Sequence, residues 1–247
     1  MTSWFKPSFA ASMFMGIGLA HATSVTIPSG TEYQGIAFGG GALNMDFYID
    51  LLQTWDSTKA TLSSYGAASA TVTKDSDGFY ESAGFSAPLT SLTIDDHTNE
   101  VLSLATTGGI TVQSPQLFGM STGGSLTVTD LNIDLANKKV YANLIGGNGV
   151  GALNNVYLWD IGSVTGLTNP TGPGTTVASM TGLKITATGY AVLEKSLGLM
   201  ILGRQLYQYT TDYGTLTATV VPEPTSSTLM GLGLAGLLIS KRRRQGA

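Results

Sequence analysis

The chain has 247 residues and no cysteine, so disulfides, thiolate metal sites and cysteine nucleophiles are excluded. Charged residues make up only 11% of it and glycine is frequent, with 32 residues, a composition typical of exported β proteins with many turns. Five of the 12 basic residues lie in the two end segments, whereas the body holds 15 of the 16 acidic residues, so the body's net charge of −8 argues against nucleic acid as a partner.

The N-terminal segment, residues 1–22, has the pattern of a secretory signal peptide. Lys6 precedes an apolar run over Phe9–Ala20, and Ala20 and Ala22 supply the small residues that cleavage requires. The run is shorter than the roughly 20 residues that cross a bilayer. We therefore expect export through the Sec translocation machinery and cleavage after Ala22; the alternative is a buried N-terminal helix.

Residues 23–220 form the predicted body. Short alternating segments separated by Gly, Asn and Asp indicate an all-β fold, which we expect to be an antiparallel β-sandwich. A body of this length buries enough surface to fold without crosslinks. Outside the hairpin described next, the predicted strands are Met45–Leu52, Ala70–Thr73, Leu89–Ile94, Val101–Ala105, Gly109–Gln113, Val156–Ile161, Leu183–Thr188, Met200–Leu202, Leu206–Thr210 and Leu216–Val220.

The clearest predicted element is a hairpin over residues 125–145. Alternation continues through it but changes parity near Thr129–Asp130, where a β-bulge would keep a single inward face. The turn is expected at Asn137–Lys139. The side chains predicted to be buried are those of Leu126, Val128, Leu131, Ile133 and Leu135.

One short helix is predicted over Tyr190–Leu197. Thr188 is its expected N-cap and Gly198 its expected stop. A helix of this length is not stable alone, so we expect it to close one end of the sandwich.

Asp75, Asp77 and Glu81 are the candidate metal ligands. Calcium prefers several hard oxygens, and Asp75–Gly78 presents two carboxylates around a tight turn. The complete EF-hand spacing is absent, and an ordinary Asp/Gly turn explains the same residues. The sequence therefore predicts no cofactor, with calcium as the alternative.

No catalytic residue is predicted, and the chain is not expected to be an enzyme. The body has one histidine, His97, and no Gly-x-Ser-x-Gly motif. Its many carboxylates leave a secreted glycoside hydrolase open. An exposed aromatic strip would instead favour sugar binding, and Tyr207 and Tyr209 are expected on one strand face. The aromatic residues considered for that role are Trp55, Tyr141, Tyr157, Trp159, Tyr207, Tyr209 and Tyr213.

The C-terminal segment, residues 221–247, places a short apolar run between a proline-flanked acid and a basic cluster. By the positive-inside rule the cluster stays in the cytoplasm and holds the body outside. The 16 residues of Thr225–Ser240 are marginal for a permanent span, so we expect a temporary anchor. The cleavage motif is Val221, Pro222, Glu223 and Pro224, and the basic stop is Lys241, Arg242, Arg243 and Arg244.

Motif, short span and terminal arginine cluster in this order resemble a PEP-CTERM sorting domain. The resemblance implies cleavage by an exosortase, a membrane-embedded protease, after transient anchoring in the inner membrane. It also implies a final place at the cell surface or in the matrix of bacteria that make exopolysaccharide. An ordinary membrane anchor is the alternative.

The body itself has a weaker resemblance. Asp134–Ala142 and Ile185–Gly189 resemble phrases in β-sandwich modules similar to the haem-binding HtaA domain. That resemblance implies the sandwich fold, and the haem ligands of those modules have no clear counterpart in this sequence.

These features predict an exported, non-enzymatic protein with a structural, adhesive or exopolysaccharide-associated role. The alternatives are a module that binds carbohydrate, Ca²⁺ or haem, and a secreted hydrolase.

Overall fold

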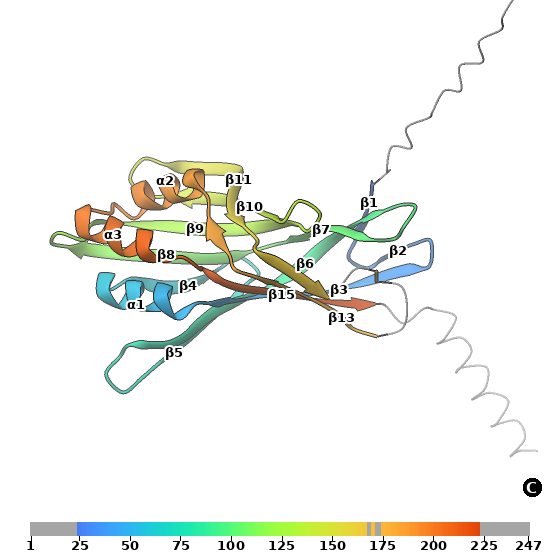
Figure 1. The fold of residues 1–247 in the computed structure, drawn as a ribbon, viewed down its shortest axis with the longest axis horizontal. Coiled ribbons are helices and arrows are strands. Elements are labelled where there is room, and N and C mark those ends of the chain that lie inside the picture. The colour runs from blue at the N-terminus through green and yellow to red at the C-terminus, as the bar shows by residue number, and fades with distance from the viewer. Residues whose placement is uncertain (1–23, 167–168, 171–173, 223–247) are drawn as a thin grey trace, which may run out of the picture.

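A computed structural model describes residues 24–166, 169–170 and 174–222 (Figure 1). The first eight strands are β1 Ser24–Pro28, β2 Thr31–Tyr33, β3 Ile36–Phe47, β4 Thr61–Tyr65, β5 Ser69–Lys74, β6 Tyr80–Asp95, β7 Val101–Thr106 and β8 Gly109–Leu117. The remaining seven are β9 Ser121–Asp134, β10 Lys139–Gly146, β11 Gly151–Asp160, β12 Ser163–Gly166, β13 Thr176–Thr181, β14 Lys184–Ile185 and β15 Gly214–Pro222. The helices are α1 Ile49–Thr58, α2 Ala187–Ser196 and α3 Ile201–Tyr209.

The strands form two layers, and all the pairings are antiparallel, which confirms the expected all-β, sandwich-like fold. One layer has the order β12-β13-β15-β3-β6, and the other continues from β6 through β7, β9, β10 and β11 to β14. Strand β6 belongs to both layers because its first half pairs with β3 and β5, and its second half pairs with β1 and β7.

The predicted hairpin over residues 125–145 is confirmed as β9 and β10. Asn132 lies opposite Tyr141 and Thr129 opposite Asn143, so two residues of β9 face one of β10. This is the predicted bulge, and Asp130 at its centre has a positive φ of 52°. All five side chains that were predicted to be buried have less than a tenth of their surface exposed.

The prediction of a single helix is wrong, because the described residues contain three. The strand predicted over Met45–Leu52 ends at Phe47, and α1 begins two residues later. The strands predicted over Met200–Leu202 and Leu206–Thr210 are parts of α3. In both helices the buried residues recur at helical spacing, such as Leu51 with Trp55 and Gly203 with Tyr207.

The helix that was predicted is present as α2, but it starts earlier. Its N-cap is Thr186, whose hydroxyl accepts the backbone N–H of Gly189 at 3.0 Å, rather than Thr188. The predicted strand Leu183–Thr188 is correspondingly reduced to the two residues of β14. The helix packs against β9, β10 and β11, as expected for an element that closes one end of the sandwich.

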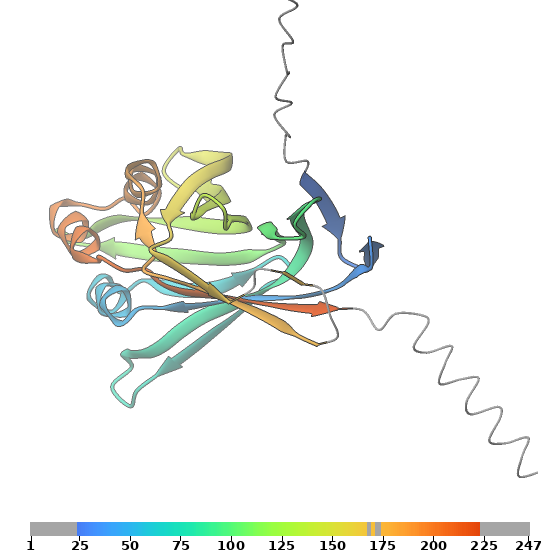
Figure 2. The same ribbon diagram turned by 45° about the vertical axis from the view of Figure 1, so that its right-hand side comes forward.

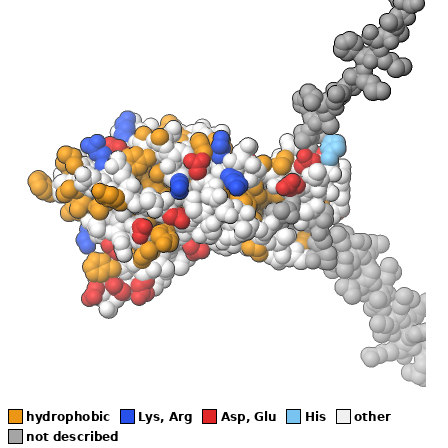
Figure 3. All heavy atoms as spheres, in the orientation of Figure 1, with side chains coloured by type: hydrophobic (Ala, Val, Ile, Leu, Met, Phe, Trp, Pro, Cys, Tyr) orange, Lys and Arg blue, Asp and Glu red, His pale blue; other side chains and the backbone are white. Residues whose placement is uncertain are grey.

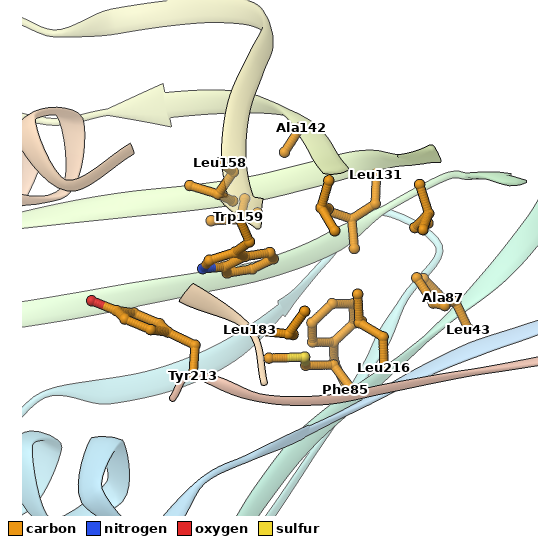
Figure 4. Close-up of a cluster of buried hydrophobic side chains, with 14 of the residues drawn as sticks. Leu43, Phe85, Ala87, Leu131, Ala142, Leu158, Trp159, Leu183, Tyr213 and Leu216 are labelled. Atoms are coloured by element: carbon orange, nitrogen blue, oxygen red, sulfur yellow. The ribbon is translucent and has the colours of Figure 1, made fainter. Parts of the chain in front are cut away.

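The core fills the space between the two layers, and Figure 4 shows side chains from both pointing toward each other. Phe85, Leu216 and Leu183 lie opposite Leu131 and Trp159 there. Aromatic residues occupy the end of the core nearest the helices, where an apolar cavity of about 40 Å³ remains. Its aromatic lining residues are Phe47, Trp55, Trp159, Tyr207 and Tyr213.

The two ends of the molecule differ. The helices α1, α2 and α3 gather at one end (left in Figure 1), whereas β1 begins and β15 finishes toward the other. The rotated view keeps this separation (Figure 2). The chain therefore enters and leaves the body at the end opposite the helices.

The predicted end segments fall mostly outside the described residues. The signal peptide, Glu223, Pro224, the apolar run and the basic stop from Lys241 to Arg244 all lie there, and the predicted boundaries of the three segments stay predictions. Val221 and Pro222 are the last residues of β15, where they pair with Gly40 and Phe38. Among the residues that are described, no helix is both long and apolar enough to span a membrane.

Candidate functional site

The outer face of β9, β10 and β11 carries a band of amide and tyrosine side chains. Along β10, Val140, Ala142 and Leu144 are buried, so the residues between them face outward. Tyr141 and Asn143 are two of these outward residues. The same alternation exposes Asn132 on β9 next to buried Leu131 and Ile133, and Asn155 is exposed on β11.

A shallow groove of about 330 Å³ crosses this face near the end where β1 begins. Its lining is rich in hydrogen-bonding groups: one tyrosine, several amides and several hydroxyls. The lining includes Ser103, Asn132, Asp134, Asn137, Tyr141 and Asn155.

Hydrogen bonds fix several of the polar groups in and beside the groove. The carboxylate of Asp134 accepts both the backbone N–H and the side-chain amide of Asn137, at 2.9 and 2.8 Å. The side-chain oxygen of Asn143 accepts the backbone N–H of Asn155 at 3.0 Å. Because these contacts already restrict the side chains of Asp134, Asn137 and Asn143, those side chains would lose little additional conformational freedom when a ligand binds.

Two tyrosines form a pair on this face. The ring centroids of Tyr141 and Tyr157 are 5.4 Å apart and their planes are inclined by 33°. The Tyr157 hydroxyl donates a hydrogen bond to the carboxylate of Asp160, and this bond, with a smaller contribution from burial, raises the pKa of Tyr157 to about 12. Lys139 Nζ lies 5.0 Å from the centre of the Tyr157 ring. Tyr157 therefore stays neutral at any physiological pH and supports the Tyr141 ring from one side.

The other aromatic residues considered from the sequence do not join this pair. Trp55, Trp159, Tyr207 and Tyr213 are buried in the core, where burial raises the pKa of both tyrosines. The expectation that Tyr207 and Tyr209 share a strand face is wrong, because α3 is a helix. Residues two apart on a helix point in nearly opposite directions, and Tyr209 is 78% exposed while Tyr207 is buried.

The candidate calcium residues lie at the far end of the β5–β6 hairpin. One carboxylate oxygen of Asp75 accepts the backbone N–H groups of Asp77 and Phe79, at 3.0 and 2.8 Å. Asp75 thus closes the turn in the way that short acidic side chains commonly do. Glu81 follows on β6, and the described residues contain no group of three or more His, Cys, Asp or Glu side chains placed to hold a metal ion.

His97 lies in the turn between β6 and β7. The Asp95 carboxylate accepts the backbone N–H groups of His97 and Thr98, and these bonds lower the pKa of Asp95. Asp95 thus organises the turn that carries His97.

Sequence reasoning considered Tyr141 and Tyr157 but missed the amides around them. The available signal was the asparagine at outward positions of the predicted hairpin, in Leu131-Asn132-Ile133 and Ala142-Asn143-Leu144. Asn155 could not be placed beside them from sequence, because its position depends on the register of β11 against β10.

Comparison with known proteins identifies the C-terminal segment. The family model of the PEP-CTERM protein-sorting motif matches residues 220–244, which contain the predicted cleavage motif and basic stop. No curated protein and no solved structure matches the chain. The resemblance of the body to HtaA-like modules thus finds no support in these comparisons. The chain is an exported protein that carries a PEP-CTERM sorting motif, by which an exosortase processes it.

Proposed function

We propose that the body is a non-catalytic module that associates with exopolysaccharide by binding a glycan chain in the groove beside Tyr141. The observation that carries the proposal is the juxtaposition of an aromatic ring with amide and hydroxyl groups along one open groove. Sugar rings present hydroxyl groups at their rim and C–H groups on their faces. Amide side chains can form hydrogen bonds with the sugar hydroxyl groups, and the face of a tyrosine ring can pack against the sugar C–H groups.

The shape and charge of the groove favour a neutral polymer. A shallow groove open to solvent can accept an internal stretch of a chain, whereas a deep pocket would select a chain end or a small molecule. The carboxylate of Asp134 in the groove already accepts two hydrogen bonds from Asn137. Lys139 of β10 lies opposite Asp134 in the register of β9 and β10. The groove itself therefore offers mainly uncharged hydrogen-bonding groups.

The sorting motif supports the proposal that the protein associates with exopolysaccharide outside the cell. Six residues lie between Pro222, the end of β15, and Leu229, the start of the apolar run, so Pro222 and Leu229 are at most roughly 25 Å apart. While the tail is in the inner membrane, the end of the body near β1 and β15 would thus stay close to the bilayer. After cleavage beside Glu223, the protein would be free to associate with surface or matrix polysaccharide.

A binding measurement with a matched control tests the proposal. The probe is the exopolysaccharide purified from the host, and the readout is co-sedimentation with the exported protein. Tyr141→Ala should weaken binding about fivefold, because one lost aromatic stacking contact contributes on the order of 1 kcal/mol. Tyr209→Ala, an exposed tyrosine on α3 far from the groove, should bind like the wild type.

Both variants should melt within about 2 °C of the wild type, since neither side chain is fully buried. Equal binding by wild type and Tyr141→Ala would refute the groove as the binding site. Failure of the wild type to bind at millimolar sugar concentration would refute the association itself.

A further inference from the structure

The end of the molecule farthest from the sorting motif carries an exposed apolar tip. We use this name for Phe118, in the turn between β8 and β9, together with Met200, Ile201 and Leu202 at the start of α3. Phe118 is completely exposed, and Ile201 and Leu202 are 69% and 49% exposed. Figure 3 shows hydrophobic side chains gathered at this end, over α3 and the neighbouring turn.

The apolar tip is held in place by the fold. The backbone N–H of Met200 donates to the carbonyl of Met120 at 2.7 Å, and that of Leu202 donates to Gly119 at 3.2 Å. The hydroxyl of Ser121 donates to the carbonyl of Leu197 at 2.6 Å. These bonds join the β8–β9 turn to the α2–α3 connection, so the tip presents one fixed shape.

A hollow of about 590 Å³ adjoins the tip, and Met200 and Ile201 belong to both. Leu199, Met200 and Ile201 supply its apolar lining. Its wall includes the ion pair between Arg204 and Glu194, whose charged atoms are 3.2 Å apart. The hollow is several times larger than a phenyl ring requires.

We infer that this end is an interface at which a second copy of the chain docks head to head. A protruding Phe118 and an adjacent apolar hollow on the same end are complementary to each other across a two-fold axis. Each copy would insert its Phe118 into the hollow of the other, which is the reciprocal arrangement of an isologous dimer. A buried aromatic residue at the centre of such a contact is the usual source of affinity.

The charge around the hollow and the position of the sorting motif both favour a second copy of the chain as the docking partner. The charged residues around the hollow are Glu194, Lys195 and Arg204, so the tip is almost neutral although the body carries a net charge of −8. Two copies that meet at their tips keep their acidic surfaces apart. The sorting motif follows β15 at the opposite end, so head-to-head docking can join proteins held on two facing surfaces. The inference is independent of the proposed glycan groove.

Crosslinking in the full chain tests the inference, because the chain has no cysteine of its own. Thr122→Cys places a thiol at the edge of the hollow, and Ser76→Cys places an exposed one on the β5–β6 turn as a control. With both variants displayed on the host, a short bis-maleimide should give a dimer for Thr122→Cys, at least about tenfold more than for Ser76→Cys. Equal crosslinking of the two, or none, would overturn the proposal.

A second substitution identifies the inserted side chain. On the Thr122→Cys background, Phe118→Asp should remove the dimer, whereas Phe79→Asp, a change at an exposed phenylalanine of the β5–β6 turn, should leave it. A dimer that persists with Phe118→Asp would refute the interface. So would a Thr122→Cys protein that gives no dimer and instead sediments with phosphatidylcholine vesicles in a way that Phe118→Asp abolishes, because the tip would then contact lipid.

Discussion

At the scale of single residues, Asp130 shows how one side chain sets the shape of the sheet. It is the bulged residue of β9, with a positive φ that aspartate tolerates better than β-branched residues do. Its carboxylate accepts the backbone N–H of Gly108 at 3.0 Å and the amide of Asn143 at 3.3 Å. The bulge is thereby tied both to the β7–β8 turn and to β10.

We predict that Asp130→Val lowers the free energy of unfolding by about 2 kcal/mol, measured by urea denaturation. Valine would be strained at this φ and would leave the Gly108 N–H without its acceptor. Asp130→Asn keeps an acceptor oxygen and tolerates the left-handed conformation, so it should cost less than about 1 kcal/mol. Equal stability of the two variants would contradict this account of the bulge.

Asp75 allows turn formation and calcium binding to be separated. Because its carboxylate oxygen already accepts two backbone N–H groups, we predict that Ca²⁺ leaves the melting temperature of the wild type unchanged. Asp75→Asn retains that oxygen and should fold like the wild type, whereas Asp75→Ala should destabilise the hairpin by about 1 kcal/mol. A calcium-dependent rise in melting temperature that Asp75→Asn abolishes would instead establish the metal site.

At the scale of elements, strict alternation is what made the β9–β10 hairpin predictable, including its bulge. The helices α1 and α3 were missed because each has fewer than three turns and contains residues that are common in strands or turns. Ile201, Leu202 and Leu206 suggested strand segments, although only Gly203 and Tyr207 are buried in α3. Apolar residues on the exposed side of a helix obscure its period, and here two of them, Ile201 and Leu202, are part of the apolar tip.

The packing of α3 against the core gives a prediction that distinguishes this helix from the strand that the sequence suggested over Leu206–Thr210. Tyr207→Ala should destabilise the protein by about 3–5 kcal/mol, because it empties a fully buried site. Tyr209→Ala, two residues away and largely exposed, should change stability by less than about 0.5 kcal/mol. Similar losses for the two variants in urea denaturation would mean that both side chains face the core, which the helix does not allow.

The lining of the groove was only partly predictable from the sequence, because it depends on how the strands are ordered in the sheet. Alternation identifies Asn132 and Tyr141 as outward residues of two neighbouring strands, and a hairpin places them opposite each other. The addition of Asn155 and Ser103 requires the order in which β11, β10, β9 and β7 lie side by side. That order depends on long-range pairing, which local sequence does not specify.

At the scale of the whole molecule, the sorting motif and the apolar tip lie toward opposite ends of the body. The end where β15 finishes leads into the sorting motif, and the helical end points away from it with the exposed apolar tip. The groove beside Tyr141, which we propose binds glycan, lies on the sheet face between the two ends, closer to the end where β1 begins. An anchored protein would thus keep its helical end free to meet other copies.

The central claim is that the PEP-CTERM motif directs cleavage of the tail, and the mass of the mature protein's C-terminus tests it most directly. In a host with an exosortase, the account predicts a mature protein that ends at or beside Pro222-Glu223-Pro224. The same host without the exosortase, or a variant with Pro222, Glu223 and Pro224 replaced by alanine, should yield a chain that retains Arg242–Arg244. Retention of these arginines by the wild type in both hosts would show that the tail is a permanent anchor and would contradict the account.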